Sequence, residues 1–110
     1  MKIFLSSQGE TLDAVLDQRF GRCAYIVIYD TETKEHSIQE NKYKDVDHAA
    51  GVKVAELAAE NNIDIVITGQ VGPKAEKTLK ANDINFIFRK EDTISSIIDA
   101  YINKKQDLHL

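Results

Sequence analysis

Cysteine is nearly absent from this chain of 110 residues, in which Cys23 is the single example. One cysteine excludes an internal disulfide and agrees with a reducing compartment. The chain also lacks an apolar run of the roughly 18 residues that a membrane-spanning helix requires. Its opening segment, MKIFLSSQGE, lacks the apolar core of a signal peptide. We therefore expect a cytoplasmic protein with no membrane partner.

An excess of positive charge is absent too. The sequence has 14 Lys and Arg against 18 Asp and Glu, a formal net charge of −4. Its densest basic clusters are only Arg19 with Arg22 and Lys104 with Lys105. Nucleic-acid binding draws on larger arrays of Lys and Arg, which neutralise phosphates. We therefore expect no nucleic-acid partner.

What the sequence does have is an alternation of short apolar segments with helical patterns. We expect strands at residues 2–7, 24–30, 35–41, 63–68 and 84–89, and helices at 47–62, 73–83 and 92–102. No repeat, low-complexity segment or linker divides these elements. We therefore expect one domain over residues 1–110, in which residues 103–110 form a frayed tail.

The resulting order, β-β-β-α-β-α-β-α, restricts the topology. Three meander strands pair antiparallel, and right-handed helical crossovers then add the last two strands in parallel. An α/β fold satisfies these rules, with a mixed five-stranded sheet in the order 3-2-1-4-5 and helices on both faces. This is the strand order of ribonuclease H-like three-layer domains. Ligands bind such sheets beyond the carboxyl ends of the parallel strands, where we expect the loop after the first strand, the start of the first helix and the TGQVGP segment to converge.

The TGQVGPKA segment combines Gly69 and Gly72, which allow a sharp turn, with Pro73 at the first position of a helix. The free N–H groups and positive dipole end of that helix can hold an anion or a cluster sulfur. The same residues also suit a strand-to-helix turn that binds nothing. No Gly-Lys-Ser/Thr sequence follows, so the segment is not a Walker loop.

The HAAG segment contains a candidate metal ligand. We expect His48 in the first turn of its helix, with Asp45 or Asp47 as the cap, where a neutral imidazole can bind a metal. Gly51 costs about 1 kcal/mol relative to Ala inside a helix, which indicates close approach of a backbone or a ligand. The alternative is an exposed histidine near a helix end, with a glycine required for packing.

The DQRFGRC segment precedes the most apolar strand. We expect Phe20 to anchor this loop in the core, and Gly21 to adopt a backbone conformation that other residues avoid. Cys23 has two interpretations. It is either a small buried side chain, or a reactive thiolate whose pKa is lowered by cationic neighbours.

The two arginines of the same loop also have two interpretations. Arg19 and Arg22 can clamp an anion, or they can pair with Asp13 and Asp17. Spacing alone favours neither arrangement, so both stay open.

The sequence excludes one catalytic interpretation and disfavours another. A ribonuclease H-type nuclease needs carboxylates that hold two metal ions, but the first strand carries none and Asp64 lies at the wrong end of its strand. A nucleophile pair of Cys23 and His48 lacks an evident third residue to orient the histidine. We therefore expect no enzymatic activity.

Taken together, four segments resemble the dinitrogenase iron–molybdenum cofactor biosynthesis family: DQRFGRCAYIVIYD, HAAG, DIVITGQVGPKAEKTL and DINFIF. The resemblance runs from about Lys2 to Tyr101. This family includes the accessory proteins NifX and NafY and the carboxy-terminal part of NifB. It implies a ribonuclease H-like fold that is not a nuclease, and a non-catalytic protein that binds, carries or stores an iron–sulfur or molybdenum–iron–sulfur cluster or its precursor.

The same resemblance implies site residues. His48 matches the histidine of the family's helix motif and is the best candidate metal ligand, with Cys23 as a second candidate. Arg19 and Arg22 would offset the negative charge of the cluster, and the turn from Gly69 to Gly72 would shape the pocket floor.

The resemblance also has consequences for loading and partners. The chain has no radical-SAM cysteine motif, so it is not a complete NifB-type enzyme. A single cysteine cannot hold a conventional four-cysteine cluster, so loading would be labile and would use external thiols or a homodimer that supplies two sites. The expected partners are the cluster itself and the proteins that donate or accept it, with the chain acting as a monomer or a homodimer.

Two rival functions remain open at this point. An anion- or nucleotide-sensing module would use the same glycine turn and arginines, and its binding would not depend on Cys23. An interaction domain would be recognised through its surface, and neither Cys23 nor His48 would matter to it.

Overall fold

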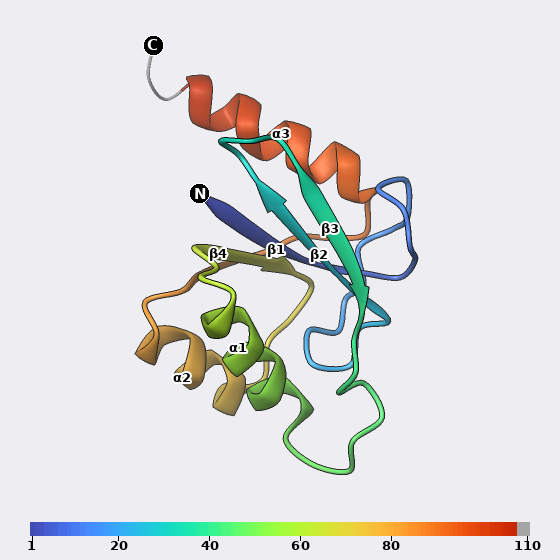
Figure 1. The fold of residues 1–110 in the computed structure, drawn as a ribbon, viewed down its shortest axis with the longest axis vertical. Helices are drawn as coiled ribbons and strands as arrows, with labels where there is room; N and C mark the ends of the chain where they lie inside the picture. Colours follow the sequence, from blue (N-terminus) through green and yellow to red (C-terminus); the bar gives the residue numbers. More distant parts are fainter. Residues whose placement is uncertain (108–110) are drawn as a thin grey trace.

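A five-stranded sheet lies between two helical layers, with α3 on one face and α1 and α2 on the other (Figure 1). The computed structural model of the chain describes residues 1–107. The elements in chain order are β1 (Lys2–Ser7), β2 (Tyr25–Asp30), β3 (His36–Glu40), α1 (Ala50–Glu60), β4 (Ile65–Thr68), α2 (Pro73–Ala81), β5 (Asn85–Phe88) and α3 (Ile94–Asp107).

The strand order is β3-β2-β1-β4-β5. The first three strands pair antiparallel, whereas β1 with β4 and β4 with β5 pair parallel. The predicted α/β fold, the element order and the sheet order 3-2-1-4-5 are therefore confirmed.

The two apolar faces of the central strands explain why both sides of the sheet carry helices. In β1, Phe4 packs in one buried cluster with Val54 of α1 and Leu79 of α2. Leu5, its neighbour in the same strand, packs in a second buried cluster with Ile97 of α3. Successive side chains of a strand point to opposite faces, and burying each large apolar side chain contributes about 1.5–3 kcal/mol.

The edges of the sheet differ in character. At one edge, β3 exposes His36, Ser37, Gln39 and Glu40 around a half-buried Ile38, which confirms the polar edge strand expected from the sequence. At the other edge lies β5, which is apolar. Within residues 1–107, no helix is both long enough and apolar enough to cross a membrane.

The start of α1 differs from the sequence prediction. The helix begins at Ala50, and its N-cap is Ala49 in the left-handed conformation (φ 62°) with no side-chain cap. The prediction that Asp45 or Asp47 caps the helix is therefore wrong. The chain enters α1 through the left-handed residue, so both carboxylates lie upstream of the N-cap position.

Helix α3 also differs at both ends. Thr93 caps it, because its Oγ1 accepts a hydrogen bond of 3.2 Å from the backbone N–H of Ser96; the expected cap, Asp92, precedes it. The helix continues to Asp107. Residues 103–107 are thus helical rather than frayed, and residues 108–110 of the expected tail lie outside the described residues.

Candidate functional site

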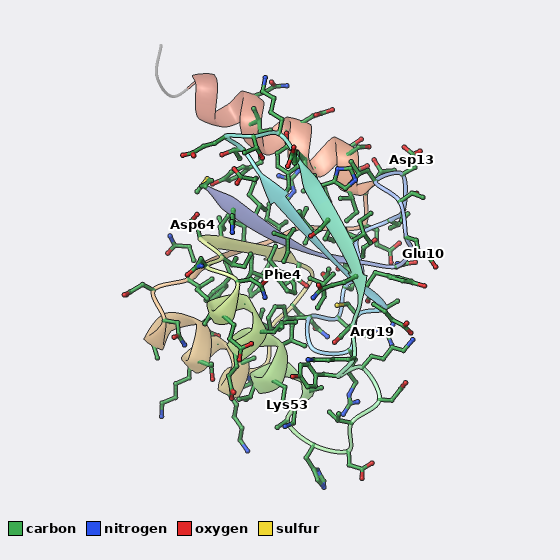
Figure 2. All side chains as sticks on the ribbon, viewed as in Figure 1. Phe4, Glu10, Asp13, Arg19, Lys53 and Asp64 are labelled. Atoms are coloured by element: carbon green, nitrogen blue, oxygen red, sulfur yellow. The ribbon has the colours of Figure 1, made fainter. Side chains whose placement is uncertain are left out.

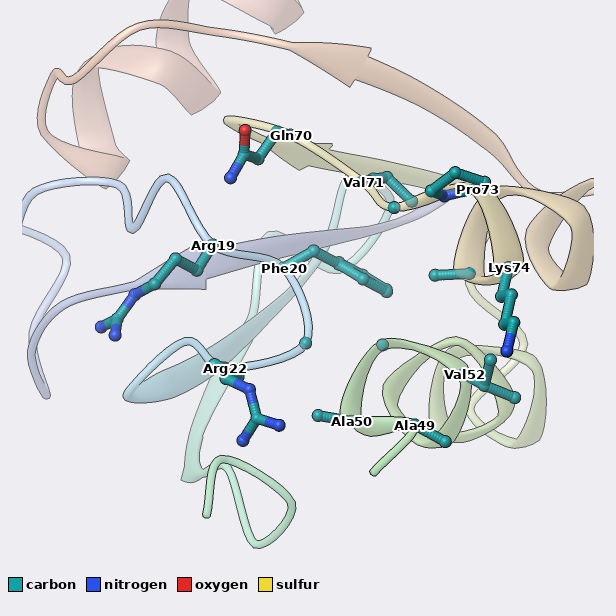
Figure 3. A pocket seen from close by; sticks show the side chains of 14 residues that line it. Arg19, Phe20, Arg22, Ala49, Ala50, Val52, Gln70, Val71, Pro73 and Lys74 are labelled. Atoms are coloured by element: carbon teal, nitrogen blue, oxygen red, sulfur yellow. The ribbon is translucent and has the colours of Figure 1, made fainter. Parts of the chain in front are cut away.

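A cavity of about 690 Å³ lies where three chain segments meet beyond the end of β4 (Figure 3). One wall is the loop at residues 19–22, the second is the start of α1 at residues 49–52, and the third is residues 70–75, which lead into α2. These are the three segments that the sequence predicted to converge. An isolated parallel β-bridge between Arg19 and Gln70 links the first of these segments to the third.

Two glycines allow the walls of this cavity to meet. A Cβ added to Gly21 would lie only 2.6 Å from the Cα of Gly51 and 2.9 Å from the carbonyl carbon of Ala50. A Cβ added to Gly51 would lie 3.1 Å from the Cβ of Ala75 in α2. The close approach predicted for Gly51 is confirmed. No glycine has a positive φ anywhere in the described chain, so the prediction of a special conformation at Gly21 is wrong: this residue is required for space.

A buried carboxylate holds the loop in place. Asp17 is only 3% exposed, and its oxygens accept hydrogen bonds from the backbone N–H groups of Arg19 (3.0 Å) and Ala24 (3.2 Å). They also accept two hydrogen bonds of 3.2 Å from the guanidinium of Arg19. These interactions raise the pKa of Arg19 above its usual value, so the guanidinium stays charged.

The loop is also anchored from inside. Phe20 is 3% exposed. The centroid of its ring lies 5.3 Å from the ring centroid of Phe4, a residue of β1. The predicted anchoring role of Phe20 is confirmed. Aromatic pairs at this separation contribute about 0.5–1.5 kcal/mol beyond the area they bury.

Replacing Asp17 with asparagine should therefore loosen this wall. The variant keeps the shape of the side chain, but one carboxylate oxygen becomes an NH₂ donor that faces other donors. We expect a loss of about 1–2 kcal/mol in the free energy of unfolding, because buried N–H groups lose their acceptor. Urea unfolding measures this change. The exposed Asp13→Asn variant is the control, with an expected change within about 0.5 kcal/mol, and equal losses in both variants would contradict the role of Asp17.

The two arginines have different partners. Arg19 pairs with Asp17, one of the two acids suggested by the sequence. Arg22 donates a hydrogen bond of 2.8 Å to the backbone carbonyl of Lys44. In Figure 3, Arg22 extends toward the start of α1, whereas Arg19 extends away from both helices.

Cys23 lies in the core rather than in the cavity. Its side chain is fully buried in the cluster under α1 and α2, and its Sγ lies 3.7 Å from the amide nitrogen of Asn41. Burial, reinforced by the negative charge of Asp17, raises the pKa of Cys23 to about 12. The interpretation of Cys23 as a thiolate made by cationic neighbours is therefore wrong: the charge of Arg19 does lower this pKa, but burial and the charge of Asp17 outweigh it. A thiol in this position cannot contact a ligand in the cavity unless the loop rearranges.

The remaining predicted site residues fall in three different settings. His48 is exposed and lies two residues before α1 rather than in its first turn, next to Ala49, which lines the cavity. A Cβ on Gly69 would lie 2.5 Å from the Cα of Gln18, so Gly69 permits contact with the loop. Gly72 lines the cavity, and a Cβ added there would meet nothing within 4 Å.

The charged side chains that line the cavity are of one sign. Among the described residues that line it, three carry a charged side chain, and all three are cations: Arg19, Arg22 and Lys74. Both helices that open onto it begin without a side-chain cap, at Ala49 and at Gly72. Unpaired N–H groups and the positive ends of helix dipoles favour anions. The net charge of the whole chain is −4, so the charged side chains at the cavity have the opposite sign to the chain as a whole.

Sequence reasoning missed Lys74. Its side chain extends from the first turn of α2 toward Val52 of α1 (Figure 3). The signal was present, because Lys74 directly follows Pro73 in the turn already singled out as an anion site.

A complete metal site is not built from these side chains. Within the residues that the structure describes, no three His, Cys, Asp or Glu side chains group closely enough to hold a metal ion. Asp64 precedes β4, and its carboxylate accepts a hydrogen bond of 2.7 Å from the backbone N–H of Lys2. It lies at the opposite end of the sheet from Arg19 (Figure 2), which agrees with the exclusion of a nuclease.

Comparison with known proteins gives three likenesses in addition to a family match. An uncharacterized protein of Methanocaldococcus jannaschii is 28% identical over 93 residues, which is 82% of this chain and 79% of that protein. The apo form of the orange protein from Desulfovibrio gigas has a TM-score of 0.87 and 30% identity, covering 94% of this chain and 88% of that one. A putative NifB protein from Thermotoga has a TM-score of 0.81 and 30% identity, covering 93% and 87%. The family model described as dinitrogenase iron-molybdenum cofactor matches residues 1–104, and the chain therefore belongs to this family.

Proposed function

We propose that this protein binds a preassembled, negatively charged iron–sulfur or molybdenum–iron–sulfur cluster, or its precursor, in the cavity and carries it without catalysing a reaction. The observation that carries the proposal is that the three charged side chains lining the cavity, Arg19, Arg22 and Lys74, are all cations. Membership in the dinitrogenase iron-molybdenum cofactor family supports an accessory role in cofactor biosynthesis. Proteins that donate the cluster and accept it from the cavity are the expected partners.

Charge and hydrogen bonding account for how the cluster would be held. Clusters rich in sulfide carry net negative charge, and their surface sulfur atoms accept hydrogen bonds. Arg22 and Lys74 supply cationic donors, and the first turns of α1 and α2 supply backbone N–H groups that have no side-chain cap. Arg19 lines the rim, where the carboxylate of Asp17 offsets its charge.

Direct metal coordination has one candidate in this arrangement. His48 is exposed and directly precedes Ala49, which lines the cavity, and neutral imidazole is a common metal ligand. Cys23 is buried in the core, so the proposal gives it a packing role. A carrier that holds its cargo mainly by charge releases it without breaking several metal–protein bonds, which suits transfer to a second protein.

Anaerobic titration with a thiomolybdate, and reconstitution with iron, sulfide and molybdate, test this proposal. We expect visible absorption from bound cluster and a defined ratio of metal to protein. Because a hydrogen bond to a charged group contributes about 1.5–3 kcal/mol, Arg22→Gln and Lys74→Gln should each weaken binding about tenfold or more. His48→Ala separates coordination from charge, since only coordination requires the imidazole.

Two variants serve as controls. Lys77→Gln removes the same charge from an exposed position of α2 that does not line the cavity, and Cys23→Ala removes the buried thiol. Both should bind like the wild type. The proposal fails if metal–sulfur species bind no better than simple salts, or if Lys77→Gln weakens binding as much as Lys74→Gln.

An anion- or nucleotide-sensing module is the second candidate, because uncapped helix N-termini beside cations also suit phosphate. Titration with inorganic phosphate and with a nucleotide discriminates the two functions. Saturable phosphate binding that is tighter than thiomolybdate binding, and unaffected by His48→Ala, would favour the sensing module.

A further inference from the structure

The loop that leads into α1 is held by few contacts. We call residues 42–48 the entry loop; it joins Asn41, which follows β3, to Ala49, the N-cap of α1. None of its seven residues is buried, although Tyr43 packs in part against the core cluster beneath α1 and α2. Segments with few buried contacts open at a low cost in free energy. The conformation of the entry loop therefore depends on individual hydrogen bonds.

The entry loop ends at a strained residue. Ala49 has a φ of 62°, and this left-handed conformation brings the Cβ of an L-residue too close to the following carbonyl oxygen. Such a conformation persists only where the surrounding structure holds it. Ala49 lines the cavity, and the exposed His48 directly precedes it. Contacts that hold the entry loop therefore also hold one wall of the cavity and fix the backbone of the candidate metal ligand.

Arg22 connects the entry loop to the cavity. Its Nη1 donates a hydrogen bond of 2.8 Å to the backbone carbonyl of Lys44, inside the loop. Arg22 also lines the cavity, where its side chain extends toward the start of α1 (Figure 3). A guanidinium has five N–H donors in a rigid plane, and the bond to Lys44 is the one that this side chain makes within the described residues. The other donors are therefore available to a ligand in the cavity.

We propose that Arg22 couples ligand binding in the cavity to the order of the entry loop, because one guanidinium holds the ligand and the carbonyl of Lys44 at the same time. The coupling rests on the proposed function, since it requires an anionic ligand in the cavity. An exposed arginine loses rotamer freedom when it binds a ligand. The carbonyl of Lys44 already restricts the side chain, so part of this cost is met before binding.

The coupling acts in both directions. A bound ligand restricts Arg22 to the position that reaches Lys44, and this stabilises the ordered entry loop. The ordered loop in turn presents Arg22 in the position that binds the ligand. Linkage requires that the two effects be equal in free energy.

Lys74 provides the contrast to Arg22. It lines the same cavity and carries the same charge, but its side chain extends toward Val52 of α1 (Figure 3). No hydrogen bond joins this side chain to the entry loop in the described part of the chain. Removal of the Lys74 charge should therefore weaken ligand binding and leave the order of the ligand-free loop unchanged.

Amide hydrogen exchange of the full chain, measured residue by residue by NMR, tests the coupling. The N–H groups of Lys44 and Val46 each donate to the carbonyl three residues earlier (3.3 Å), so their exchange reports opening of the entry loop. Without ligand, Arg22→Gln should exchange these two amides about tenfold faster than the wild type, because it loses a hydrogen bond from a charged donor. Lys74→Gln should exchange them like the wild type.

The second arm adds tetrathiomolybdate until visible absorption shows that each protein is saturated. Exchange of the Lys44 and Val46 amides should slow about fivefold or more in the wild type and in Lys74→Gln, but not in Arg22→Gln. The amide of Lys34 is the internal control, because it donates to Asp30 (2.8 Å) in the turn between β2 and β3. Its exchange should be the same in all three proteins, with and without ligand, which also shows that each variant is folded.

The possible failures are distinguishable. Bound tetrathiomolybdate that leaves the two loop amides of the wild type unchanged, or that protects them equally in Arg22→Gln, would overturn the coupling and leave the proposed function standing. Wild-type exchange in ligand-free Arg22→Gln would do the same. If inorganic phosphate binds and tetrathiomolybdate does not, the proposed function fails and phosphate replaces it in the same comparison. If neither anion binds, the proposed function and the coupling both fail.

Discussion

Gly21→Val is expected to lower the free energy of unfolding by about 3 kcal/mol, because the new side chain would enter space already filled by backbone. Its Cβ would lie 2.6 Å from the Cα of Gly51 and 2.9 Å from the carbonyl carbon of Ala50. Backbone atoms of a helix start cannot move aside as a flexible side chain can. The loop and α1 must therefore separate, and this widens the cavity. Differential scanning calorimetry should show a fall in Tm of about 10–20 °C.

Gly72→Ala is the matched control for this effect. Gly72 lines the same cavity, but its φ of −70° suits any residue and a Cβ there meets nothing within 4 Å. We expect its stability to change by no more than about 1 kcal/mol, since the smaller entropy of the unfolded chain offsets a poorer N-cap. Equal losses in the free energy of unfolding for the two glycine variants would show that the close contact between Gly21 and Gly51 does not cause the loss in Gly21→Val.

The sheet was predictable from the sequence because its determinants are local or topological. Apolar runs, the single Ile38 of a polar edge strand and Pro73 at a helix start each define one element. The rules for crossover handedness then leave one sheet order. The convergence of three segments into a cavity follows from that order, so the position of the cavity could be predicted although the directions of its side chains could not.

Side-chain directions within the loop were not predictable in the same way. Arg19 and Arg22 lie close to Cys23 in the sequence, which suggested a cationic environment for the thiol. In the fold, Arg19 turns to Asp17 and Arg22 turns to the carbonyl of Lys44, while the cysteine turns inward. Spacing along a loop does not fix which way a side chain points, because tertiary partners decide it.

Asn41 is a second example of a role that the sequence does not signal. It is 1% exposed, and its amide donates to the carbonyls of Gly21 (2.9 Å) and Cys23 (3.0 Å). It therefore joins the end of β3 to the loop that lines the cavity. A single asparagine at the end of a polar strand resembles an ordinary turn residue until the loop packs against it.

The buried thiol predicts a specific alkaline loss of stability. In the native protein the pKa of Cys23 is raised to about 12, mainly by burial, against an ordinary value of 9.0 in the unfolded chain. Above the lower value the unfolded chain releases this proton and the native protein does not, so stability falls as pH rises. Each pH unit in this interval costs about 1.4 kcal/mol. Below the unfolded pKa the contribution is fully present.

Urea unfolding of the wild type and of Cys23→Ala at two pH values isolates this contribution. Between about pH 8 and about pH 10.5, the wild type should lose about 2 kcal/mol more than the variant, because all other titrating groups are common to both proteins. Parallel losses would show that Cys23 ionises in the folded protein near its ordinary pKa. A thiolate available at that pH would be accessible to metal, and Cys23 would then rejoin His48 as a candidate ligand.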